Sequence, residues 1–389
     1  MRMAQRFSAG LICIPALKGW AIVCAMRSVD LQIEDVAFGG KGVARDEGKA
    51  VFVPFTIDGE RITANIVREK KQFAEGELVE LLEPSSQRTT PECPYFGRCG
   101  GCSYQHISYP HQLELKARQV EQAMKRIGRL AEPPMRSMVP SPLPYQYRNR
   151  ITVHAQDEVI GFYRRDVHEL MDIKQCPISM PEVNAALAQL RATRVRDGHY
   201  TLRAHSGPRV FAQTNDAVAD AIANHLAQIF TGEEKLLIDA FCGAGFFAKR
   251  FASQFERVVG IDWDRFAIAA AQKGASPNEG YVSGDVTTEL RWLLQQSDLA
   301  STALIVDPPA TGLSAEMRRA ILDSPPRTMI YVSCNPPTLA RDIAELRQRF
   351  TVVSITPFDM FPQTAEIEAV AHLISLETAR PRAVGERRY

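Results

Sequence analysis

Short apolar runs and amphipathic segments alternate through the second half of the chain. The apolar runs are LLIDAF, RVVGID, ALIVD, TMIYVS and TVVSITPF, and segments with helical periodicity lie between them. Continuous apolar runs of this length are typical of strands that are buried on both faces of a parallel sheet and connected by helices. The pattern predicts an α/β fold with a doubly wound, mainly parallel sheet over residues 211–389.

The pattern is different in residues 28–85. Apolar and polar residues alternate there in short stretches, which are broken by Gly-Gly and Asp-Gly turns such as AFGGKG and TIDGE. This alternation predicts a small antiparallel β-barrel of about five strands. Residues 29–84 carry twelve acidic and seven basic side chains, which favours a solvated surface over a clamp for phosphates.

A third region, residues 86–210, is expected to form a central domain. An amphipathic helix is predicted from about His111 to Ile127, and a hairpin over residues 151–180. Residues 86–150 carry ten basic and four acidic side chains and end in the run YQYRNR (145–150). That run is as typical of an RNA contact, through stacking and phosphate pairing, as it is of an ordinary strand start.

The two ends of the chain look separate from the folded regions. The apolar stretch LICIPALKGWAIVCAM is interrupted by Lys18 and is too short to span a bilayer, and no small-residue cleavage site follows it. We interpret residues 1–27 as a dispensable extension, with an export signal as the weaker alternative. The tail ARPRAVGERRY is expected to fray. No membrane partner is expected.

Composition changes this picture only through the cysteines. The 389 residues are enough for two or three domains, and a net charge of +1 neither demands nor excludes a polyanionic partner. Of eight cysteines, Cys93, Cys99 and Cys102 fall within ten residues, and Cys176 follows in KQCPIS. Such spacing in a chain of this length favours a metal site in a reducing cytoplasm over a disulfide framework.

Two glycines follow the first apolar run of the α/β region, in LLIDAFCGAGFFAKRFA. Gly243 and Gly245 would let a ligand approach the backbone at the carboxyl end of a strand. Asp262 ends the next strand, where an acid can bind both ribose hydroxyls, and Asp285 follows a third strand at a place suited to adenine. The third glycine of a pyrophosphate motif is absent, as is a P-loop. S-adenosylmethionine therefore fits this pattern better than a dinucleotide does.

Reactive or charged residues follow two further strands. Asp307 ends ALIVD and Cys334 follows TMIYVS, so both are expected at the carboxyl edge of the sheet. A buried cysteine is more often inert, but Cys334 precedes a predicted helix whose first amides would lower the pKa of a thiol. An acid, Glu368, follows in DMFPQTAEIEAV.

This set of groups suits the methylation of carbon 5 of a uridine. That carbon becomes nucleophilic only when a thiolate adds to carbon 6, and a base must afterwards remove the proton from carbon 5. Cys334 is the candidate nucleophile and Glu368 the candidate base. The target base would have to be flipped out of its stack to reach them.

The motifs resemble those of the RNA uracil-5 methyltransferases of ribosomal and transfer RNA, over about residues 28–373. YVSCNPPTLARD is similar to the family's nucleophile motif and DMFPQTAEIE to its base motif, which implies those roles for Cys334 and Glu368. FAQTN, DAFCGAG, VVGID and DPP are similar to segments that bind cofactor or substrate. The residues that the resemblance implies there are Gln213, Phe241, Asp262 and Asp307.

The resemblance also extends over the first two regions. Residues 28–85 look like the family's TRAM domain, an oligonucleotide-binding barrel, followed by a central α+β iron–sulfur domain over 86–210 and a Rossmann-like class I methyltransferase domain over 211–389. Four thiolates suit zinc as well as iron, so the residues alone leave the metal open. The resemblance implies a [4Fe–4S] cluster, with the ligands Cys93, Cys99, Cys102 and Cys176.

The chain departs from the family pattern in three places, and its target has alternatives. Ala310 stands where arginine is common, Gln363 where histidine is common, and Phe246 where asparagine is frequent. Family members with both a TRAM domain and a cluster mostly modify large-subunit RNA, which implies 23S ribosomal RNA as the partner and no obligate protein partner. The alternatives are the T-loop uridine of transfer RNA and a non-catalytic RNA-binding or assembly role. A cytosine-5 methyltransferase is disfavoured because DPPATG lacks a cysteine.

Overall fold

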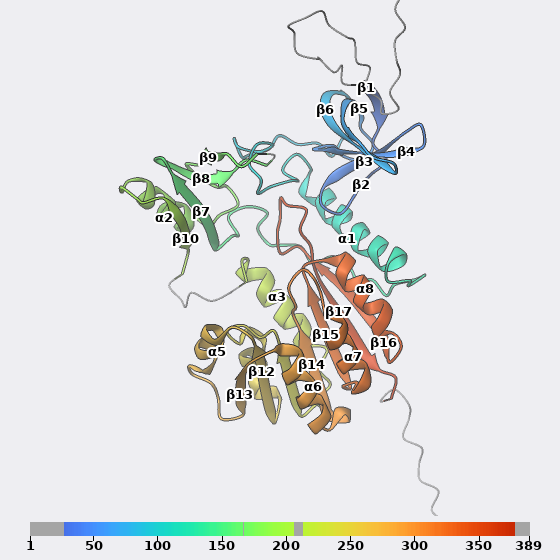
Figure 1. Cartoon of the computed structure of the whole chain (residues 1–389), viewed down its shortest axis with the longest axis vertical. Helices are drawn as coiled ribbons and strands as arrows, with labels where there is room; N and C mark the ends of the chain where they lie inside the picture. Colours follow the sequence, from blue (N-terminus) through green and yellow to red (C-terminus); the bar gives the residue numbers. More distant parts are fainter. Residues whose placement is uncertain (1–26, 166, 206–212, 378–389) are drawn as a thin grey trace, which may run out of the picture. The chain divides into compact units, whose positions relative to one another are not determined.

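A computed structural model describes residues 27–165, 167–205 and 213–377 (Figure 1). The chain divides into two compact units. The described part of unit 1 comprises residues 27–115, 162–165, 167–173 and 363–365, and that of unit 2 comprises 116–161, 174–205, 213–362 and 366–377. The predicted extension, apart from Arg27, and the predicted frayed tail lie outside the described residues. No helix in the described residues is long and apolar enough to cross a membrane.

Unit 1 contains a six-stranded sheet with the strand order β1-β5-β6-β4-β3-β2. Its strands are β1 (Arg27–Gln32), β2 (Asp35–Val36), β3 (Lys41–Asp46), β4 (Lys49–Pro54), β5 (Arg61–Glu69) and β6 (Phe73–Glu83). Alternate residues, among them Val51, Val53, Ile62 and Ala64, pack into one core, as the alternation in the sequence predicts. Neighbouring strands are antiparallel except for β4 and β6, which pair in parallel.

Unit 2 is built on a seven-stranded sheet with the order β13-β12-β11-β14-β15-β17-β16. Its strands are β11 (Leu236–Ala240), β12 (Arg257–Asp262), β13 (Glu279–Ser283), β14 (Thr302–Val306), β15 (Thr328–Ser333), β16 (Phe350–Phe358) and β17 (Glu368–Ser375). The first five in this order are parallel. The predicted doubly wound, mainly parallel sheet is confirmed.

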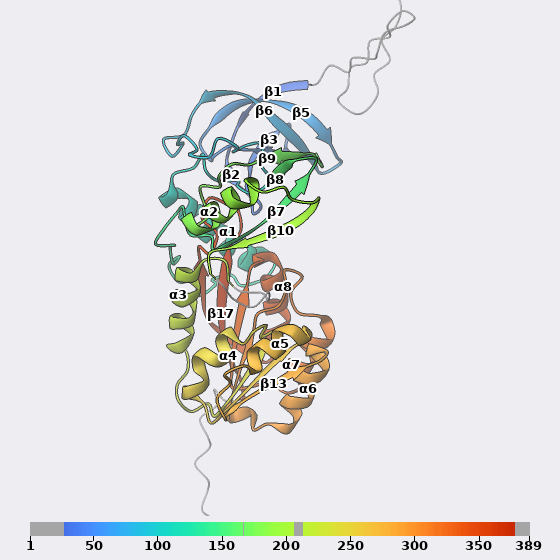
Figure 2. The same cartoon turned by 90° about the vertical axis from the view of Figure 1, so that its left-hand side faces the viewer.

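Helices cover both faces of this sheet. They are α3 (Asp216–Ala227), α4 (Phe246–Phe251), α5 (Arg265–Gln272), α6 (Val286–Gln296), α7 (Ala315–Asp323) and α8 (Pro336–Leu346). In β11, Leu237 packs into a core with α3 and α4, whereas Ile238 and Ala240 pack into a core with α6, α7 and α8. Figure 2 shows α3 and the group α6 to α8 on opposite sides of the strands. Because both of their faces are buried, the central strands β14 and β15 consist mostly of apolar residues.

The apolar runs did not predict β17. This strand pairs antiparallel with both β15 and β16. Its sequence, EAVAHLIS, starts with an acid and contains a histidine, so it lacks the continuous apolar signal of the central strands. Because β17 runs opposite to β15, its first residue, Glu368, lies at the edge where β15 ends.

The central region contributes elements to both units. They are α1 (Tyr109–Arg126), β7 (Arg150–Gln156), β8 (Val159–Tyr163), β9 (Leu170–Asp172), α2 (Pro181–Arg191) and β10 (Gly198–Arg203). Two short 3-10 helices, η1 (Ala252–Gln254) and η2 (Leu299–Ser301), lie in the α/β region. The predicted helix is confirmed as α1. The predicted hairpin is confirmed in β7 and β8, which pair antiparallel.

The second tyrosine of the run YQYRNR, Tyr147, is not exposed for stacking on a base. Tyr147 is buried, and its hydroxyl donates to the carbonyl oxygen of Pro362 at 2.9 Å. Arg150 begins β7. Of the two interpretations, the strand start is therefore the one that the structure supports, because the Tyr147 ring is needed for packing.

A buried ion pair stabilises the segment before β17. Lys116 Nζ on α1 lies 2.6 Å from Asp359 Oδ1 and also donates to the carbonyl oxygen of Phe361 at 3.0 Å. Both charged side chains are fully buried. The pair therefore connects the middle of α1 with the end of β16.

We expect Lys116→Met to lower the free energy of unfolding by about 3–5 kcal/mol, because it leaves the Asp359 carboxylate buried without its partner. Lys125→Met on the same helix removes an exposed pair with Glu121 and is expected to cost less than about 1 kcal/mol. Urea denaturation of the two variants measures the difference. Equal, small losses would show that the buried pair contributes no more than the exposed one.

Candidate active site

The turn after β11 has a backbone that few residues tolerate. Phe241, Gly243 and Gly245 all have positive φ angles, of 67°, 54° and 82°. A Cβ atom on Gly245 would lie 2.8 Å from the hydroxyl oxygen of Tyr281, so glycine is required there. For Phe241 this conformation is strained, and such strain is typical of ligand-binding turns.

The acid at the end of β12 holds this turn in place. Asp262 is buried, and its Oδ2 accepts a hydrogen bond from the Gly243 amide at 2.9 Å, while its Oδ1 accepts one from the Asp264 amide at 2.8 Å. A carboxylate has about four acceptor positions, so ribose hydroxyls can still bind it. Asp285 is exposed and caps α6, with the Thr288 amide donating to it at 2.8 Å. The hydroxyl and the amide of Thr288 both donate to the Asp285 carboxylate, and these two hydrogen bonds lower its pKa.

Gln213 lies in a segment that is anchored from two sides. Its carbonyl oxygen accepts a hydrogen bond from Asn149 Nδ2 at 2.9 Å. Two residues later, Asn215 caps α3, and its Nδ2 donates to the carbonyl oxygen of Met360 at 3.3 Å. The segment is therefore connected to the loop that leads to Glu368.

Strand pairing brings the candidate nucleophile and base together. Ser333, the last residue of β15, pairs with Ala369 of β17. Cys334 directly follows Ser333 and Glu368 directly precedes Ala369, and the Glu368 carboxylate acts electrostatically on the Cys334 thiol. Asp307 follows the neighbouring strand β14, and its amide donates to the carbonyl oxygen of Ala240 at 3.3 Å. Cys334 is partly buried, and Glu368 is buried.

The electrostatics of Cys334 differ from the sequence expectation. Burial, followed by the carboxylates of Glu368 and Asp307, raises the pKa of the Cys334 thiol to about 11. The helix does not offset this, because the first two residues of α8 are prolines without an N–H group. The expectation that the helix amides lower this pKa was therefore wrong for the protein without its ligands.

The remaining amides at the start of α8 are already engaged. The Asn335 amide donates to Ser333 Oγ at 3.2 Å, and the Thr338 amide donates to the Asn335 side chain at 3.2 Å. These amides are therefore not available to stabilise a Cys334 thiolate.

Sequence reasoning missed one acid, Asp239 on β11. It is fully buried, its Oδ2 accepts from the Ala248 amide at 2.9 Å, and its Oδ1 has no hydrogen-bond partner among the described residues. Burial chiefly raises the pKa of Asp239 to about 8, with smaller contributions from Asp307 and Asp262. The signal in the sequence was an acid inside the apolar run LLIDAF.

Several carboxyl groups lie at this edge of the sheet. Burial raises the pKa of Asp307 to about 7, and burial together with Asp307 and Glu366 raises the pKa of Glu368 well above its usual range. Raised carboxyl pKa values mean that a bound positive charge would be stabilised here. The site therefore fits a cationic ligand such as a sulfonium.

The raised thiol pKa predicts the pH dependence of Cys334 reactivity. Because the thiolate is the reactive form, the alkylation rate of Cys334 by iodoacetamide in the ligand-free protein is expected to rise about tenfold per pH unit from pH 7 to pH 10. Asp307→Asn removes one negative charge and should move the profile to lower pH. Mass spectrometry of the Cys334 peptide measures both rates. A plateau below pH 8 in the wild type would contradict this account.

Three of the four cysteines predicted to bind a cluster, Cys93, Cys99 and Cys102, belong to unit 1, and the fourth, Cys176, belongs to unit 2. The Gly101 amide donates to Cys99 Sγ at 3.4 Å. In the described residues, no group of three or more His, Cys, Asp or Glu side chains could hold a metal ion.

Two of the three departures from the family pattern have structural roles. Gln363 is buried and has a positive φ of 69°, and its side chain and amide exchange two hydrogen bonds with Gln112, both at 3.0 Å. The carbonyl oxygen of Ala310 accepts from Thr338 Oγ1 at 3.2 Å. Phe246 begins α4 and is 39% exposed.

Family models match the regions that carry this site. The model described as tRNA (uracil-5-)-methyltransferase matches residues 291–375, which include Asp307, Cys334 and Glu368. The TRAM domain model matches residues 25–79, and a model of RNA cap guanine-N2 methyltransferases matches residues 234–319, which include the glycine turn. The fold and the site thus define an S-adenosylmethionine-dependent methyltransferase with a TRAM domain.

Relatives extend the match over nearly the whole chain. An uncharacterized RNA methyltransferase of Protochlamydia amoebophila is 30% identical, over 89% of this chain and 97% of the relative. One of Bdellovibrio bacteriovorus is also 30% identical, over 89% of this chain and 94% of the relative. The chain belongs to the family of RNA uracil-5 methyltransferases.

A solved structure shares the fold. It is the Pyrococcus abyssi tRNA (uracil-54, C5)-methyltransferase in complex with S-adenosyl-L-homocysteine, with a TM-score of 0.69 and 23% identity. The match covers 89% of this chain and 100% of the other. The likeness therefore includes the complete architecture of that enzyme.

Proposed function

We propose that this RNA methyltransferase methylates carbon 5 of a uridine in structured RNA through a covalent bond between Cys334 and carbon 6 of the uracil. The observation that carries the proposal is the pairing of Ser333 with Ala369, whose neighbours in the chain are Cys334 and Glu368. Asp307 interacts electrostatically with both groups. A nucleophile and a base side by side at the ligand-binding edge of the sheet suit this reaction.

The cofactor-binding role is assigned to the residues around the glycine turn. S-adenosylmethionine supplies, when bound, an electrophilic methyl group on a positively charged sulfur. Asp262 would bind the ribose and Asp285 the adenine, while Gln213 and Phe241 would border the rest of the cofactor. The carboxyl groups of Asp239 and Asp307 favour the positive charge that the methyl donor carries.

The chain's residues account for each proton in the reaction. The Cys334 thiol loses its proton to the neighbouring Asp307 carboxylate, whose pKa near 7 suits a general base. The thiolate adds to carbon 6, and the π electrons of the ring move toward oxygen 4 to form an enolate. Carbon 5 of the enolate then takes up the methyl group. Glu368 removes the proton from carbon 5, the double bond reforms, and the thiolate leaves.

A fluorinated substrate tests this covalent step. RNA that contains 5-fluorouridine has no proton on carbon 5 for Glu368 to remove, so the methylated adduct with Cys334 is expected to persist. Gel electrophoresis under denaturing conditions and mass spectrometry of the Cys334 peptide detect the adduct. Wild-type protein that methylates uridine RNA and forms no adduct would refute the proposal.

For the target we propose a uridine in 23S ribosomal RNA. The support is the combination of a TRAM domain with the four-cysteine pattern, which among the family members that the sequence resembles points to the large subunit. A second candidate is the T-loop uridine of transfer RNA. It is favoured by the Pyrococcus abyssi enzyme, which has the same architecture and is described as acting on uracil 54 of tRNA.

Mapping of 5-methyluridine in a deletion strain distinguishes the two targets. Loss of the modification from a 23S position that the cloned gene restores supports the first target. Loss at tRNA position 54 alone supports the second. Unchanged 5-methyluridine in both RNAs would contradict both.

We further propose that Cys93, Cys99, Cys102 and Cys176 bind a [4Fe–4S] cluster, and no step of the reaction depends on it. The four thiols are the donor set that such a cluster requires, and the amide that donates to Cys99 Sγ is of the kind that tunes cluster potentials. Protein purified without oxygen is expected to contain about four irons and four sulfides per chain. Stoichiometric zinc without sulfide would refute the cluster.

A further inference from the structure

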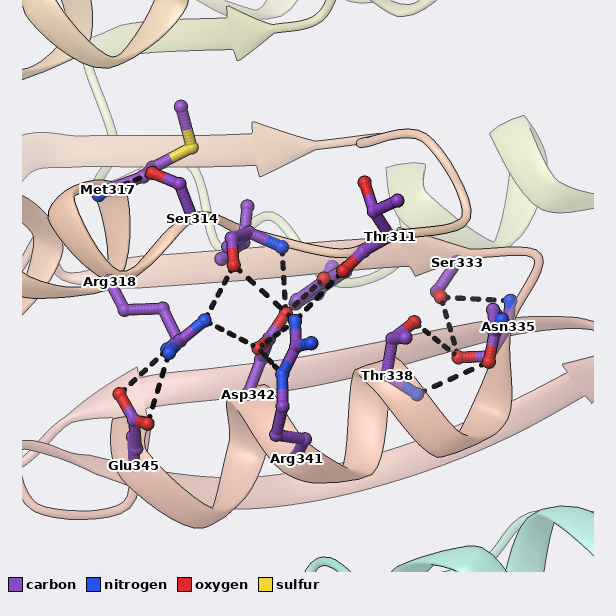
Figure 3. A network of polar contacts seen from close by, with 12 residues as sticks. Thr311, Ser314, Met317, Arg318, Ser333, Asn335, Thr338, Arg341, Asp342 and Glu345 are labelled. Atoms are coloured by element: carbon purple, nitrogen blue, oxygen red, sulfur yellow. Dashed lines mark hydrogen bonds and ion pairs between the residues drawn. The ribbon is translucent and has the colours of Figure 1, made fainter.

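The loop after Asp307 is fastened to the helix that follows Cys334. Thr338 Oγ1 donates to the carbonyl oxygen of Ala310 at 3.2 Å, and Arg341 Nη2 donates to that of Thr311 at 2.9 Å. Both donors lie on α8, one helical turn apart. Figure 3 shows the Arg341 side chain reaching from the helix toward Thr311.

Asp342 is the centre of this network. Its side chain is fully buried, and its Oδ2 accepts from the Leu313 amide at 2.8 Å and from the Tyr331 hydroxyl at 2.7 Å. Its Oδ1 accepts from Arg341 Nε at 2.9 Å and from Arg318 Nη1 at 3.1 Å. One carboxylate therefore joins the loop, β15, α7 and α8, and two guanidinium groups balance its charge (Figure 3).

The loop approaches this carboxylate as closely as its backbone allows. Gly312 has a positive φ of 74°, and a Cβ atom on it would lie 2.6 Å from Asp342 Oδ2 and 2.7 Å from Arg341 Nη2. Arg318 Nη1 also donates to the carbonyl oxygen of Leu313 at 2.6 Å. Polar side chains thus determine the path of the loop, and position 312 has no room for a residue larger than glycine.

The network connects two catalytic positions that lie on different strands. Asp307 precedes the fastened loop by three residues, and Cys334 immediately precedes Asn335, the cap of α8. From these contacts we infer that Asp342 is a positioning residue, which through the loop and α8 sets the distance between Asp307 and the Cys334 thiol. The inference rests on the proposed covalent mechanism. Asp342 would then affect the reaction without touching the reacting atoms.

The physical reason lies in the geometry that proton transfer demands. A displacement of about 1 Å between reacting groups can lower a rate about 10²-fold, even when the displaced groups are chemically intact. Among the described residues, the hydrogen bonds that Asp342 accepts involve none of those in the turns after β11 and β12, and S-adenosylhomocysteine lacks the positive charge that Asp307 favours. The rate of adduct formation should therefore respond to this network, while cofactor affinity should not.

Three substitutions test the role. Asp342→Asn keeps the shape and loses the charge that holds both arginines. Arg341→Met leaves Asp342 intact and removes a side chain that is 44% exposed, so its effect on folding should be small. Both are expected to slow adduct formation with saturating 5-fluorouridine RNA about 10²-fold, with an unchanged dissociation constant for S-adenosylhomocysteine and an unchanged KM for RNA. Arg341→Lys, which can still reach the carboxylate, should recover part of the rate.

Arg319→Met is the matched control, because Arg319 lies on α7 with its side chain 83% exposed and pairs only weakly with Asp323. It should behave as wild type. A wild-type adduct rate in Arg341→Met, or a loss of S-adenosylhomocysteine affinity that parallels the loss of rate, would overturn the inference. If Asp342→Asn does not fold, Arg341→Met decides alone. Failure of the wild type to form any adduct would instead overturn the proposed mechanism, and the inference with it.

Discussion

Cys334→Ala is expected to abolish methylation, with a loss of at least about 10⁴-fold in turnover, because the other thiol at the carboxyl edge, Cys242, is buried and burial raises its pKa. The variant should form no adduct with 5-fluorouridine RNA. Cys334→Ser should behave in the same way, since a hydroxyl beside two carboxylates ionises even less readily than the thiol. Transfer of labelled methyl groups into RNA and denaturing electrophoresis provide the two measurements.

Folding and cofactor binding serve as the control for this loss. Cys334 is only partly buried and follows the last residue of β15, so its side chain contributes little to the cores of the sheet. The thermal midpoint and the dissociation constant for S-adenosylhomocysteine should therefore stay close to those of the wild type. An adduct formed by Cys334→Ala would assign the nucleophile to another residue.

Glu368→Gln is expected to produce a different defect, in which turnover falls about 10²–10⁴-fold while a covalent complex accumulates on ordinary uridine RNA. The reason is that methyl transfer precedes the removal of the carbon 5 proton. Without the base, the methylated uracil stays bound to Cys334 Sγ. Mass spectrometry should therefore find the Cys334 peptide joined to a methylated uridine, whereas the wild type shows no such species at steady state.

Glu366→Gln provides the matched control for this variant. Glu366 is exposed, lies two residues away on the same segment, and carries the same functional group. It should retain most of its turnover and accumulate no complex. A folded Glu368→Gln variant that lost turnover but accumulated no adduct would contradict this role. Glu368 would then be needed before methyl transfer, for example to activate the thiol.

The strand ends could be predicted well because their signal is local. Asp262, Asp307 and Cys334 each follow a continuous apolar run, and a run that is buried on both faces must be a strand of the sheet. Glu368 was predicted from its motif, but its strand was not. The position of β17 between β15 and β16 depends on pairing between strands that are not consecutive in the sequence. Its own sequence, EAVAHLIS, carries no continuous apolar signal.

The state of the thiol could not be predicted in the same way. A helix start after Cys334 suggested a lowered pKa, whereas the neighbouring carboxylates of Glu368 and Asp307 come from distant parts of the sequence. Their effect depends on distances that arise only when three strands meet. Asp239 was missed for the same reason, since one acid in an apolar strand gains meaning only through the acids on the neighbouring strands.

Composition, periodicity and motif spacing were thus enough to establish an α/β methyltransferase with a strand-rich first domain, its glycine turn and its candidate nucleophile and base. These are properties of short segments, because burial and backbone conformation act on consecutive residues. Tertiary structure alone decided that the paired ends of β15 and β17 carry Cys334 and Glu368, that burial and neighbouring acids raise the pKa values of carboxyl groups at the sheet edge, and that Asp342 joins the Asp307 loop to α8. Each of these depends on Coulombic or hydrogen-bond contacts between residues far apart in the chain, which act only over a few ångströms.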